Sequence, residues 1–242
     1  MPVNAPRTAL VTGANRGIGH AVARALHRRG HRVVVTARDD ETARRAAAGI
    51  GADVAALSLD VTDVDSVGRA ARLAGPVDML VCNAGVLLDA DTDPVVVDLA
   101  LVERTFAVNL LGTWRTVQAF LPGMLGRGWG RVVFVSSGTT REFGQGLFPR
   151  TPGYSLSKAA VNGLTTMLAA QVAGSGVLVN AVNPGRVRTR MMPGAASGPE
   201  TAAAVIAEAA ELPDDGPNGR FLRAADFAKS TVDAGDDSGE WR

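Results

Sequence analysis

The sequence predicts an α/β protein built as one doubly wound parallel sheet of about seven strands, with helices on both faces. Short apolar runs alternate with helical patterns along the whole chain. The runs are continuous rather than alternating, which is typical of parallel strands buried on both faces. Because no linker-like stretch interrupts this pattern, residues 1–242 are expected to form a single domain, with a polar C-terminal tail from about residue 233.

The expected elements follow from apolar runs, helical spacing and stop signals. In the first helix, Ile18, Val22 and Leu26 recur at helical spacing and Gly30 ends the pattern. The strands are expected at 7–12, 33–36, 54–59, 77–82, 131–135, 177–182 and 220–222. The helices are expected at 18–30, 40–48, 63–74, 95–123, 154–172 and 201–210, the fourth ending near Pro122.

Composition narrows the class of protein. Hydrophobic residues make up 46% of the 242 residues, which is enough for a buried core and excludes wholesale disorder. The formal net charge of +1 argues against a broad nucleic-acid-binding face. The chain lacks an apolar run of about 18 residues and an N-terminal apolar region, so we expect no membrane span and a cytoplasmic location.

Cysteine and histidine usage points away from an internal disulfide, a reactive thiol and a metal site. The single cysteine, Cys82, lies in an apolar run and is expected to be a buried small hydrophobe. His20, His27 and His31 fall in one helix and its exit, with no second ligand cluster. The sequence therefore predicts no metal site.

A glycine-rich turn follows the first expected strand and reads Thr12-Gly13-Ala14-Asn15-Arg16-Gly17-Ile18-Gly19. Glycines at such a turn let backbone N–H groups approach a pyrophosphate, whose charge the helix dipole favours. The strand before it and the helix after it predict dinucleotide binding in a Rossmann-type fold. The turn lacks the Gly-Lys-Ser/Thr of nucleotide triphosphatases, so nucleotide hydrolysis is disfavoured.

The end of the second strand bears on the choice between NAD and NADP. An acidic residue there binds the ribose 2′-OH, whereas arginine suits a 2′-phosphate. The sequence places Ala37 where the acid is expected, followed by Arg38, and Arg16 adds a second cation. These residues predict NADPH. The alternative is that both arginines are surface residues facing Asp39 and Asp40.

Tyr154, the only tyrosine, precedes Lys158 by four residues. On a helix these two side chains share one face. An ammonium beside a phenol favours the phenolate and lowers its pKa from about 10 towards neutrality, although one neighbour is a weak source for so large a shift. The alternative is a surface helix with a packed tyrosine and a solvated lysine.

Across residues 7–223 the motifs together resemble the short-chain dehydrogenase/reductase family. They are Thr12-Gly13-x-x-x-Gly17-x-Gly19, Asp60-Val61, Asn83-Ala84-Gly85, Asn109, Ser136-Ser137, Tyr154-x-x-x-Lys158 and Pro184-Gly185. Thr36-Ala37-Arg38-Asp39 and the stretch 212–221 are most similar to the NADPH-dependent carbonyl reductases within it. The resemblance implies a sheet in the order 3-2-1-4-5-6-7 with the cofactor across the carboxyl ends of the strands.

The resemblance also implies roles for matching residues. Tyr154 would be the general acid, Lys158 would lower its pKa and bind the nicotinamide ribose, Ser137 would orient the carbonyl, and Asn109 would hold a proton-relay water. A bound oxidised nicotinamide would add a second positive charge near the phenol. The implied cofactor-binding residues are Gly13, Asn15, Arg16, Gly17, Ile18, Gly19, Arg38, Asp60, Val61, Asn83, Ala84, Gly85, Tyr154, Lys158, Pro184, Gly185, Val187 and Thr189.

Structural interpretations of some of these residues stay open. Asn109 could simply bond backbone groups, Ser136 and Ser137 could be turn residues at a strand end, and Asp60 could serve the cap of the next helix. The chain also departs from the family pattern at three places. They are Cys82 in place of an asparagine, Arg186 where tryptophan is common, and extra residues between Ser137 and Tyr154 that include Arg141, Phe143, Phe148 and Arg150.

The leading hypothesis is NADPH-dependent reduction of a small-molecule ketone or aldehyde. The alternatives are an NAD(P)-dependent alcohol dehydrogenase working oxidatively and a non-catalytic NADP-binding sensor. An apolar substrate wall is expected from Leu87, Leu88, Leu147, Phe148, Met191 and Met192. The family commonly forms dimers or tetramers through the Tyr154 helix and the helix before it, so a homo-oligomer and a monomer both remain open.

Overall fold

A computed structural model describes residues 6–140 and 147–228. Its centre is a 7-stranded sheet in the order β3-β2-β1-β4-β5-β6-β7, and every adjacent pair of strands is parallel. The expected doubly wound fold and strand order are therefore confirmed. The order reverses between β1 and β4, which is where such sheets open a crevice at the carboxyl ends of their strands.

The strands and helices lie close to their expected positions. The strands are β1 Thr8–Val11, β2 Arg32–Ala37, β3 Ala55–Ser58, β4 Met79–Cys82, β5 Gly130–Val135, β6 Val177–Val182 and β7 Phe221–Leu222. The helices are α1 Gly17–Arg28, α2 Asp40–Ala48, α3 Val64–Ala74, α4 Leu99–Phe106, the π-helix η1 Ala107–Gly112, α5 Thr113–Arg127, α6 Pro152–Gln171, α7 Pro199–Ala210 and α8 Ala224–Ala228.

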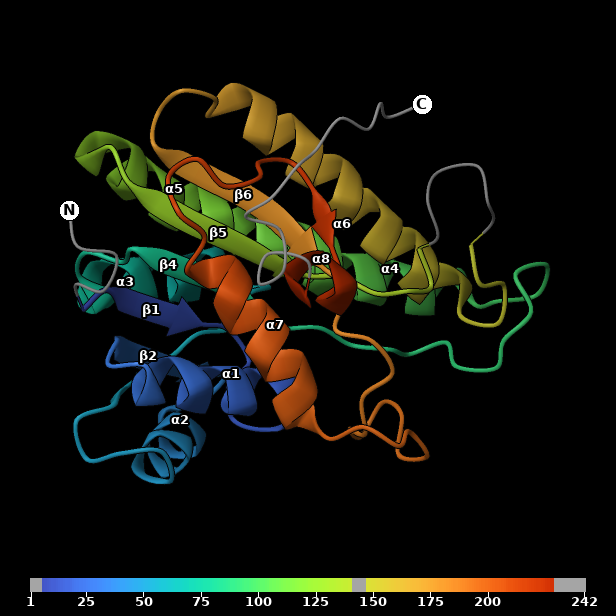
Figure 1. Ribbon diagram of the computed structural model, residues 1–242. Helices are drawn as coiled ribbons and strands as arrows, with labels where there is room; N and C mark the ends of the chain where they lie inside the picture. The colour runs from blue at the N-terminus through green and yellow to red at the C-terminus, as the bar shows by residue number, and fades with distance from the viewer. Residues whose placement is uncertain (1–5, 141–146, 229–242) are drawn as a thin grey trace.

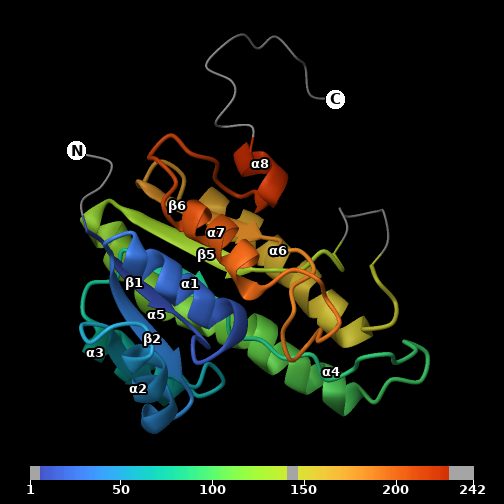
Figure 2. The same cartoon turned by 60° about the horizontal axis from the view of Figure 1, so that its bottom comes forward.

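Alternate residues of each strand supply two separate cores. In β1, Ala9 and Val11 pack with α1, α2 and α7, whereas Leu10 packs with α3, α5 and α6 on the opposite face. Figures 1 and 2 show the sheet between these two layers of helices. Both faces are covered, which explains why the strand sequences read as continuous apolar runs.

The long helix expected at 95–123 differs from the prediction. It begins at Leu99, where the Asp98 carboxylate accepts a hydrogen bond from Ala100 N (2.9 Å), and it continues as α4, η1 and α5 to Arg127. Pro122 does not end it. The carbonyl that a proline leaves without a donor belongs to the residue four positions earlier, and Gln118 is exposed, so water can reach it. Gly128, with φ of 67°, ends the helix instead.

The ends of the chain add two observations. The short helix α8 was not expected, and the expected polar tail from 233 lies outside the described residues. Among residues 6–140 and 147–228, no helix is both long and apolar enough to cross a membrane.

Candidate active site

Four parallel strands end at the same edge of the sheet. β1, β4, β5 and β6 end at Val11, Cys82, Val135 and Val182. The segments that follow them hold the glycine turn, Asn83-Ala84-Gly85, Ser136-Ser137 and the stretch 183–189. The topology therefore brings the sequence motifs to one edge, as expected.

The glycine turn is packed directly against the segment after β4. Gly13 has φ of 62°, and a Cβ there would lie 3.0 Å from Ala84 Cα. A Cβ at Gly19 would overlap Asn83 Nδ2. Asn83 Nδ2 donates to Thr12 O (2.9 Å) and Gly13 O (3.2 Å), so this side chain braces the turn with its own donors. Glycine is required at 13 and 19 because the backbone approaches too closely for a side chain.

The start of α1 suits an anionic group. No side chain of the described residues caps the helix at Arg16, and its first turn contains no acidic residue. Arg16 is exposed and Gly17 has φ of 56°. A Cβ at Gly17 would lie 3.7 Å from Thr189 Cγ2, so the segment after β6 closes over this turn. Open N–H groups, a cation and a glycine turn fit a dinucleotide pyrophosphate.

Arg38 lies exposed immediately after β2. The two carboxylates offered as its alternative partners also have other partners. Asp39 caps α2 by accepting from Thr42 N (2.8 Å), and Asp40 pairs with Arg44 at 3.6 Å. Arg38 nevertheless lies near enough to Asp39 and Asp60 to help lower the pKa of both carboxyls, so the surface alternative stays open and a 2′-phosphate contact stays a prediction.

Asp60 is not the cap of the helix that follows it. Asp63 caps α3 through Asp65 N (2.9 Å), while Asp60 Oδ1 accepts from Thr62 N (2.8 Å) and Thr62 Oγ1 (2.7 Å). These bonds to Thr62, helped by the nearby Arg38, lower the pKa of Asp60. Asp60 therefore lies near Arg38 as a stable carboxylate at the strand edge, and Val61 beside it is buried.

Tyr154 and Lys158 lie in the first turns of α6. Lys158 is 5% exposed, its Nζ donates to Val135 O (2.7 Å), and it lies 5.8 Å from the centre of the tyrosine ring. Burial lowers the pKa of Lys158 to about 8. The solvated-lysine alternative is therefore wrong.

The pKa of Tyr154 differs in direction from the prediction. Burial raises it, and a hydrogen bond with Ser137 offsets part of that rise. The expected lowering by Lys158 is not seen among the protein's own groups, because the Lys158 ammonium is directed at the Val135 carbonyl and its charged form is itself disfavoured by burial.

The two serines after β5 face different partners. Ser136 is buried and its Oγ donates to Asn162 Oδ1 of α6 (2.7 Å). Ser137 is partly exposed, accepts from Thr139 N (3.2 Å) and lies close enough to the Tyr154 phenol to lower its pKa. Of the two serines, only Ser137 is therefore placed to contact a ligand bound next to the Tyr154 phenol.

Asn109 lies in the π-helix η1 and is fully buried. Its Oδ1 accepts from Val86 N (2.8 Å), and its Nδ2 donates to Val86 O (2.9 Å) and Ser157 Oγ (3.0 Å). The Asn109 side chain therefore bonds backbone groups, which agrees with the alternative given for it above. Its role in holding a relay water stays a prediction. Ser157 was missed by the sequence reading although it lies inside the Tyr-x-x-x-Lys motif. Its Oγ donates to Tyr154 O (2.7 Å).

The segment after β6 forms a second wall of the site. Asn183 Oδ1 accepts from Gly185 N (3.0 Å), next to Pro184, and Val187 is buried where it pairs with Ser197. Gly85 lies close to the Tyr154–Lys158 pair, since a Cβ there would lie 3.6 Å from Lys158 Nζ.

The expected substrate-lining residues are mostly on the surface. Leu88, Leu147, Phe148, Met191 and Met192 are exposed, and so is Arg186. Arg141 and Phe143 lie outside the described residues.

Cys82 and the histidines have structural surroundings. Burial raises the pKa of the Cys82 thiol to about 12, which keeps it unreactive. His27 bonds Asp53 (2.9 Å) and His31 bonds Glu211 (2.8 Å). Within the described part of the chain, no group of three or more histidine, cysteine or acidic residues could hold a metal ion.

Residues 7–199 match the model of a family described as short chain dehydrogenase. The chain belongs to the short-chain dehydrogenase/reductase family. Oxidoreductase UcpA from Salmonella typhimurium is 38% identical over 215 residues, which cover 85% of this chain and 79% of that protein. Acetoacetyl-CoA reductase from Allochromatium vinosum is 35% identical over 196 residues, which cover 76% of each protein.

A solved family member gives a similar result. The structure of 3-ketoacyl-(acyl-carrier-protein) reductase from Brucella melitensis complexed with NADH has a TM-score of 0.82 and 25% identity, covering 90% of this chain and 96% of that one. The resemblance seen in the motifs is thereby confirmed at the level of the family, and the protein is an oxidoreductase of that family.

Proposed function

We propose that this protein reduces a ketone or aldehyde to an alcohol with NADPH, using Tyr154 as the general acid. The observation that carries the proposal is the meeting of Tyr154, Ser137 and Lys158 beside the glycine turn at one edge of the sheet. When bound, the reduced nicotinamide supplies the hydride that the carbonyl carbon receives. The chain supplies the proton.

Each side chain has a distinct task in this reaction. Ser137 Oγ holds the carbonyl oxygen, and the Tyr154 phenol gives that oxygen its proton, leaving a phenolate. The Lys158 ammonium stabilises the phenolate. A phenol whose pKa is raised by burial stays protonated at neutral pH, as a proton donor requires.

Two relatives support a reductive role and suggest where to look for a substrate. They are named as reductases of acetoacetyl-CoA and of a 3-oxoacyl-[acyl-carrier-protein], and the second, from Aquifex aeolicus, is 34% identical over 197 residues. Thioesters with a ketone at C3 should therefore be tested beside simple ketones and aldehydes.

Replacing Tyr154 by phenylalanine tests the reaction. We expect Tyr154→Phe to lower kcat by about 10²–10⁴-fold or more, because the proton donor is lost while the ring still packs. NADPH oxidation is followed by absorbance with the carbonyl panel, and NADPH affinity and Tm are measured as controls. Turnover retained by Tyr154→Phe contradicts the proposal, and so does wild-type inactivity on the whole panel.

The proposed preference for NADPH rests on Arg38, which is exposed after β2, and on Arg16, which is exposed in the glycine turn. A charge-assisted hydrogen bond contributes about 1.5–3 kcal/mol, or about tenfold or more. We expect Arg38→Ala to lower the NADPH/NADH ratio of kcat/KM by about tenfold. Arg44→Ala, which removes an exposed arginine paired with Asp40, is the matched control. An unchanged ratio in Arg38→Ala contradicts this preference.

We also propose that the chain forms a homo-oligomer through the outer faces of η1, α5 and α6. Leu111, Trp114, Leu156 and Met167 are exposed large hydrophobic side chains on these elements. Members of the family often associate, and covering these side chains with a second copy would remove them from water. Sedimentation equilibrium measures the state directly.

A further inference from the structure

Asp89 is a buried carboxylate in the segment after β4, with 1% of its surface exposed. Its Oδ2 accepts hydrogen bonds from Gly153 N (2.5 Å) and Tyr154 N (3.3 Å). Both N–H groups belong to the first turn of α6, where the helix itself offers no acceptor. Asp89 therefore caps α6 from another part of the chain, and its negative charge also suits the positive end of the helix dipole.

The residue next to α6 does not perform this task. Thr151 is the N-cap by position, but its side chain does not cap the helix and instead bonds Ser155 Oγ (2.9 Å). Ser155 Oγ also donates to Phe148 O (3.0 Å), so the loop before α6 is held without Asp89. The Asp89 contact thus acts on the turn that carries Tyr154 and not on the preceding loop.

The second oxygen of Asp89 sets this residue apart. Among the buried side-chain oxygen and nitrogen atoms of the described residues, only Asp89 Oδ1 lacks a hydrogen-bond partner. An unsatisfied buried oxygen is costly, and such a group needs an explanation in a native structure. If capping α6 were the only role, Thr151 at the N-cap position could perform it without leaving a buried oxygen unsatisfied.

Asp89 completes a chain of bonds that holds the Tyr154 backbone at both ends. Its carboxylate binds the Tyr154 N–H, while Ser157 Oγ binds the Tyr154 carbonyl (2.7 Å). Asn109 Nδ2 donates to Ser157 Oγ (3.0 Å) and also holds Val86, three residues before Asp89. The segment after β4 is therefore fixed to η1 at one end and to Tyr154 at the other.

We propose that Asp89 is a positioning residue whose carboxylate fixes the first turn of α6 and so keeps the Tyr154 phenol against Ser137. The proposal rests on the proposed function in taking Tyr154 as the proton donor. Asp89 itself lies at the backbone of the turn and transfers no proton.

Three variants separate positioning from stability. Displacing a reacting group by about 1 Å can cost about 10²-fold in rate, so we expect Asp89→Ala to lower kcat by about 10–100-fold. NADPH affinity should stay within about twofold, because the glycine turn is untouched. Asp89→Asn keeps an acceptor for the two N–H groups and should recover most of kcat. Asp63→Ala removes the exposed cap of α3 and should leave kcat unchanged.

A measurement without substrate tests the same point. Because Tyr154 is the only tyrosine, a ring-¹³C label gives a single tyrosine resonance that reports the ionisation of the phenol. Burial raises the pKa of Tyr154 in the wild type. We expect Asp89→Ala to move the titration towards the usual value of about 10 as the turn frays and water reaches the phenol. Asp89→Asn and Asp63→Ala should titrate like the wild type.

The possible outcomes distinguish a positioning role of Asp89 from a purely structural one. Lower Tm in Asp89→Ala, with kcat and the tyrosine titration unchanged, overturns the proposal and leaves Asp89 a structural cap. An inactive wild type with a shifted titration in Asp89→Ala refutes the proposed reaction while keeping the positioning role. If Asp89→Ala does not fold, Gly153→Ala replaces it, because a Cβ there would lie 3.1 Å from Asp89 Oδ2 and 3.1 Å from Val102 Cγ2. It should shift both readouts in the same direction, and no shift in either overturns the proposal.

Discussion

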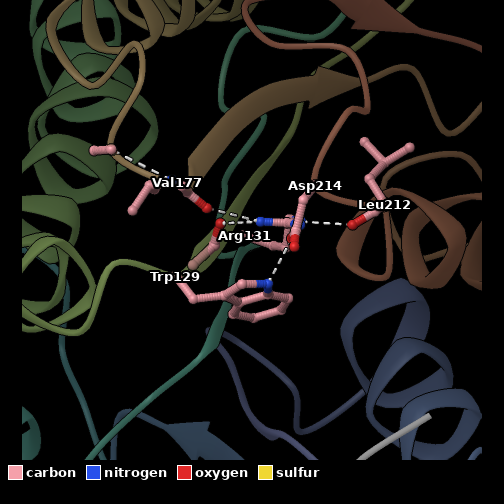
Figure 3. A network of polar contacts seen from close by, with 8 residues as sticks. Trp129, Arg131, Val177, Leu212 and Asp214 are labelled. Carbon is pink, nitrogen blue, oxygen red and sulfur yellow. Dashed lines mark hydrogen bonds and ion pairs between the residues drawn. The ribbon is translucent and has the colours of Figure 1, made fainter. Parts of the chain in front are cut away.

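Two buried cations stand at opposite ends of strand β5 and differ in how their charge is satisfied. At the amino end, Arg131 is 1% exposed, and its Nη2 pairs with Asp214 Oδ1 at 2.6 Å. Its other donors bind carbonyl oxygens of Leu212 (2.6 Å), Gly130 (2.9 Å) and Gly176 (3.1 Å). Figure 3 shows this network converging on the guanidinium beside Trp129.

At the carboxyl end of β5, Lys158 makes fewer polar contacts than Arg131 does. Its Nζ makes one hydrogen bond, to Val135 O (2.7 Å), and no carboxylate of the described residues lies within 4.0 Å of it. Burial lowers the pKa of Lys158 to about 8. Burial also lowers the pKa of Arg131, but Asp214 opposes the shift and a guanidinium remains charged.

The comparison separates a cation that serves the fold from one available for chemistry. A buried charge with four of its five N–H donors engaged ties segments together, here β5, Gly176 before β6 and the segment 212–214. A buried charge with unused donors keeps them for a ligand or a reacting group, and such strained titratable groups cluster at functional sites. Arg131 and Lys158 have similar burial, so bonding and not burial distinguishes them.

Exchanging each cation for methionine gives the largest expected effects. Lys158→Met should lower kcat by about 10²–10⁴-fold with the chain still folded, since the phenolate loses its cation. Arg131→Met should lower the free energy of unfolding by about 2–4 kcal/mol, since it removes charge-assisted hydrogen bonds, while kcat per folded molecule stays near wild type. Urea unfolding and steady-state turnover measure the two quantities on the same samples.

The same experiment can contradict the roles assigned to the two cations. Trp129→Phe is a control for packing at the amino end, because Arg131 stacks on this ring at 4.2 Å from its centre. A large loss of kcat in folded Arg131→Met, or full activity in Lys158→Met, contradicts the division of roles between the two ends of β5.

Much of the fold was predictable because its signals are local. Continuous apolar runs mark the strands, and the positive φ of Gly13 and Gly17 follows from the glycine pattern after the first of them. The motifs were also predictable as neighbours, because parallel strands end at one edge. The closeness of Tyr154 and Lys158 followed from their spacing on one helix, while their catalytic roles stay a proposal.

The missed features depend on contacts between distant segments. Asp89 is 64 residues from Gly153 in the sequence and lies in a segment without periodicity, so nothing local marks it as a cap. The π-helix around Asn109 and the passage of α5 through Pro122 depend on packing and exposure, which helical periodicity does not report. The direction of the Tyr154 pKa was missed because spacing gives adjacency to Lys158 but not burial.

The dependence of stability on pH gives the smallest effect and the sharpest contrast between the two cations. The pKa of Lys158 falls from its usual 10.5 to about 8 in the folded chain. Below about pH 8 both folded and unfolded states hold the proton, and above it the folded state releases its proton first. The unfolded state then binds more protons, so wild-type stability should rise relative to Lys158→Met, by about 2 kcal/mol between about pH 7 and pH 9.5. Tyr154 is present in both chains, and its raised pKa is caused by burial and not by Lys158, so its contribution cancels. The difference between wild type and Arg131→Met should stay flat over the same range, because a guanidinium does not titrate there. Urea unfolding at about pH 7, 8.5 and 9.5 measures both differences, and a flat line for Lys158→Met would show that the lysine is not held as a strained, available charge.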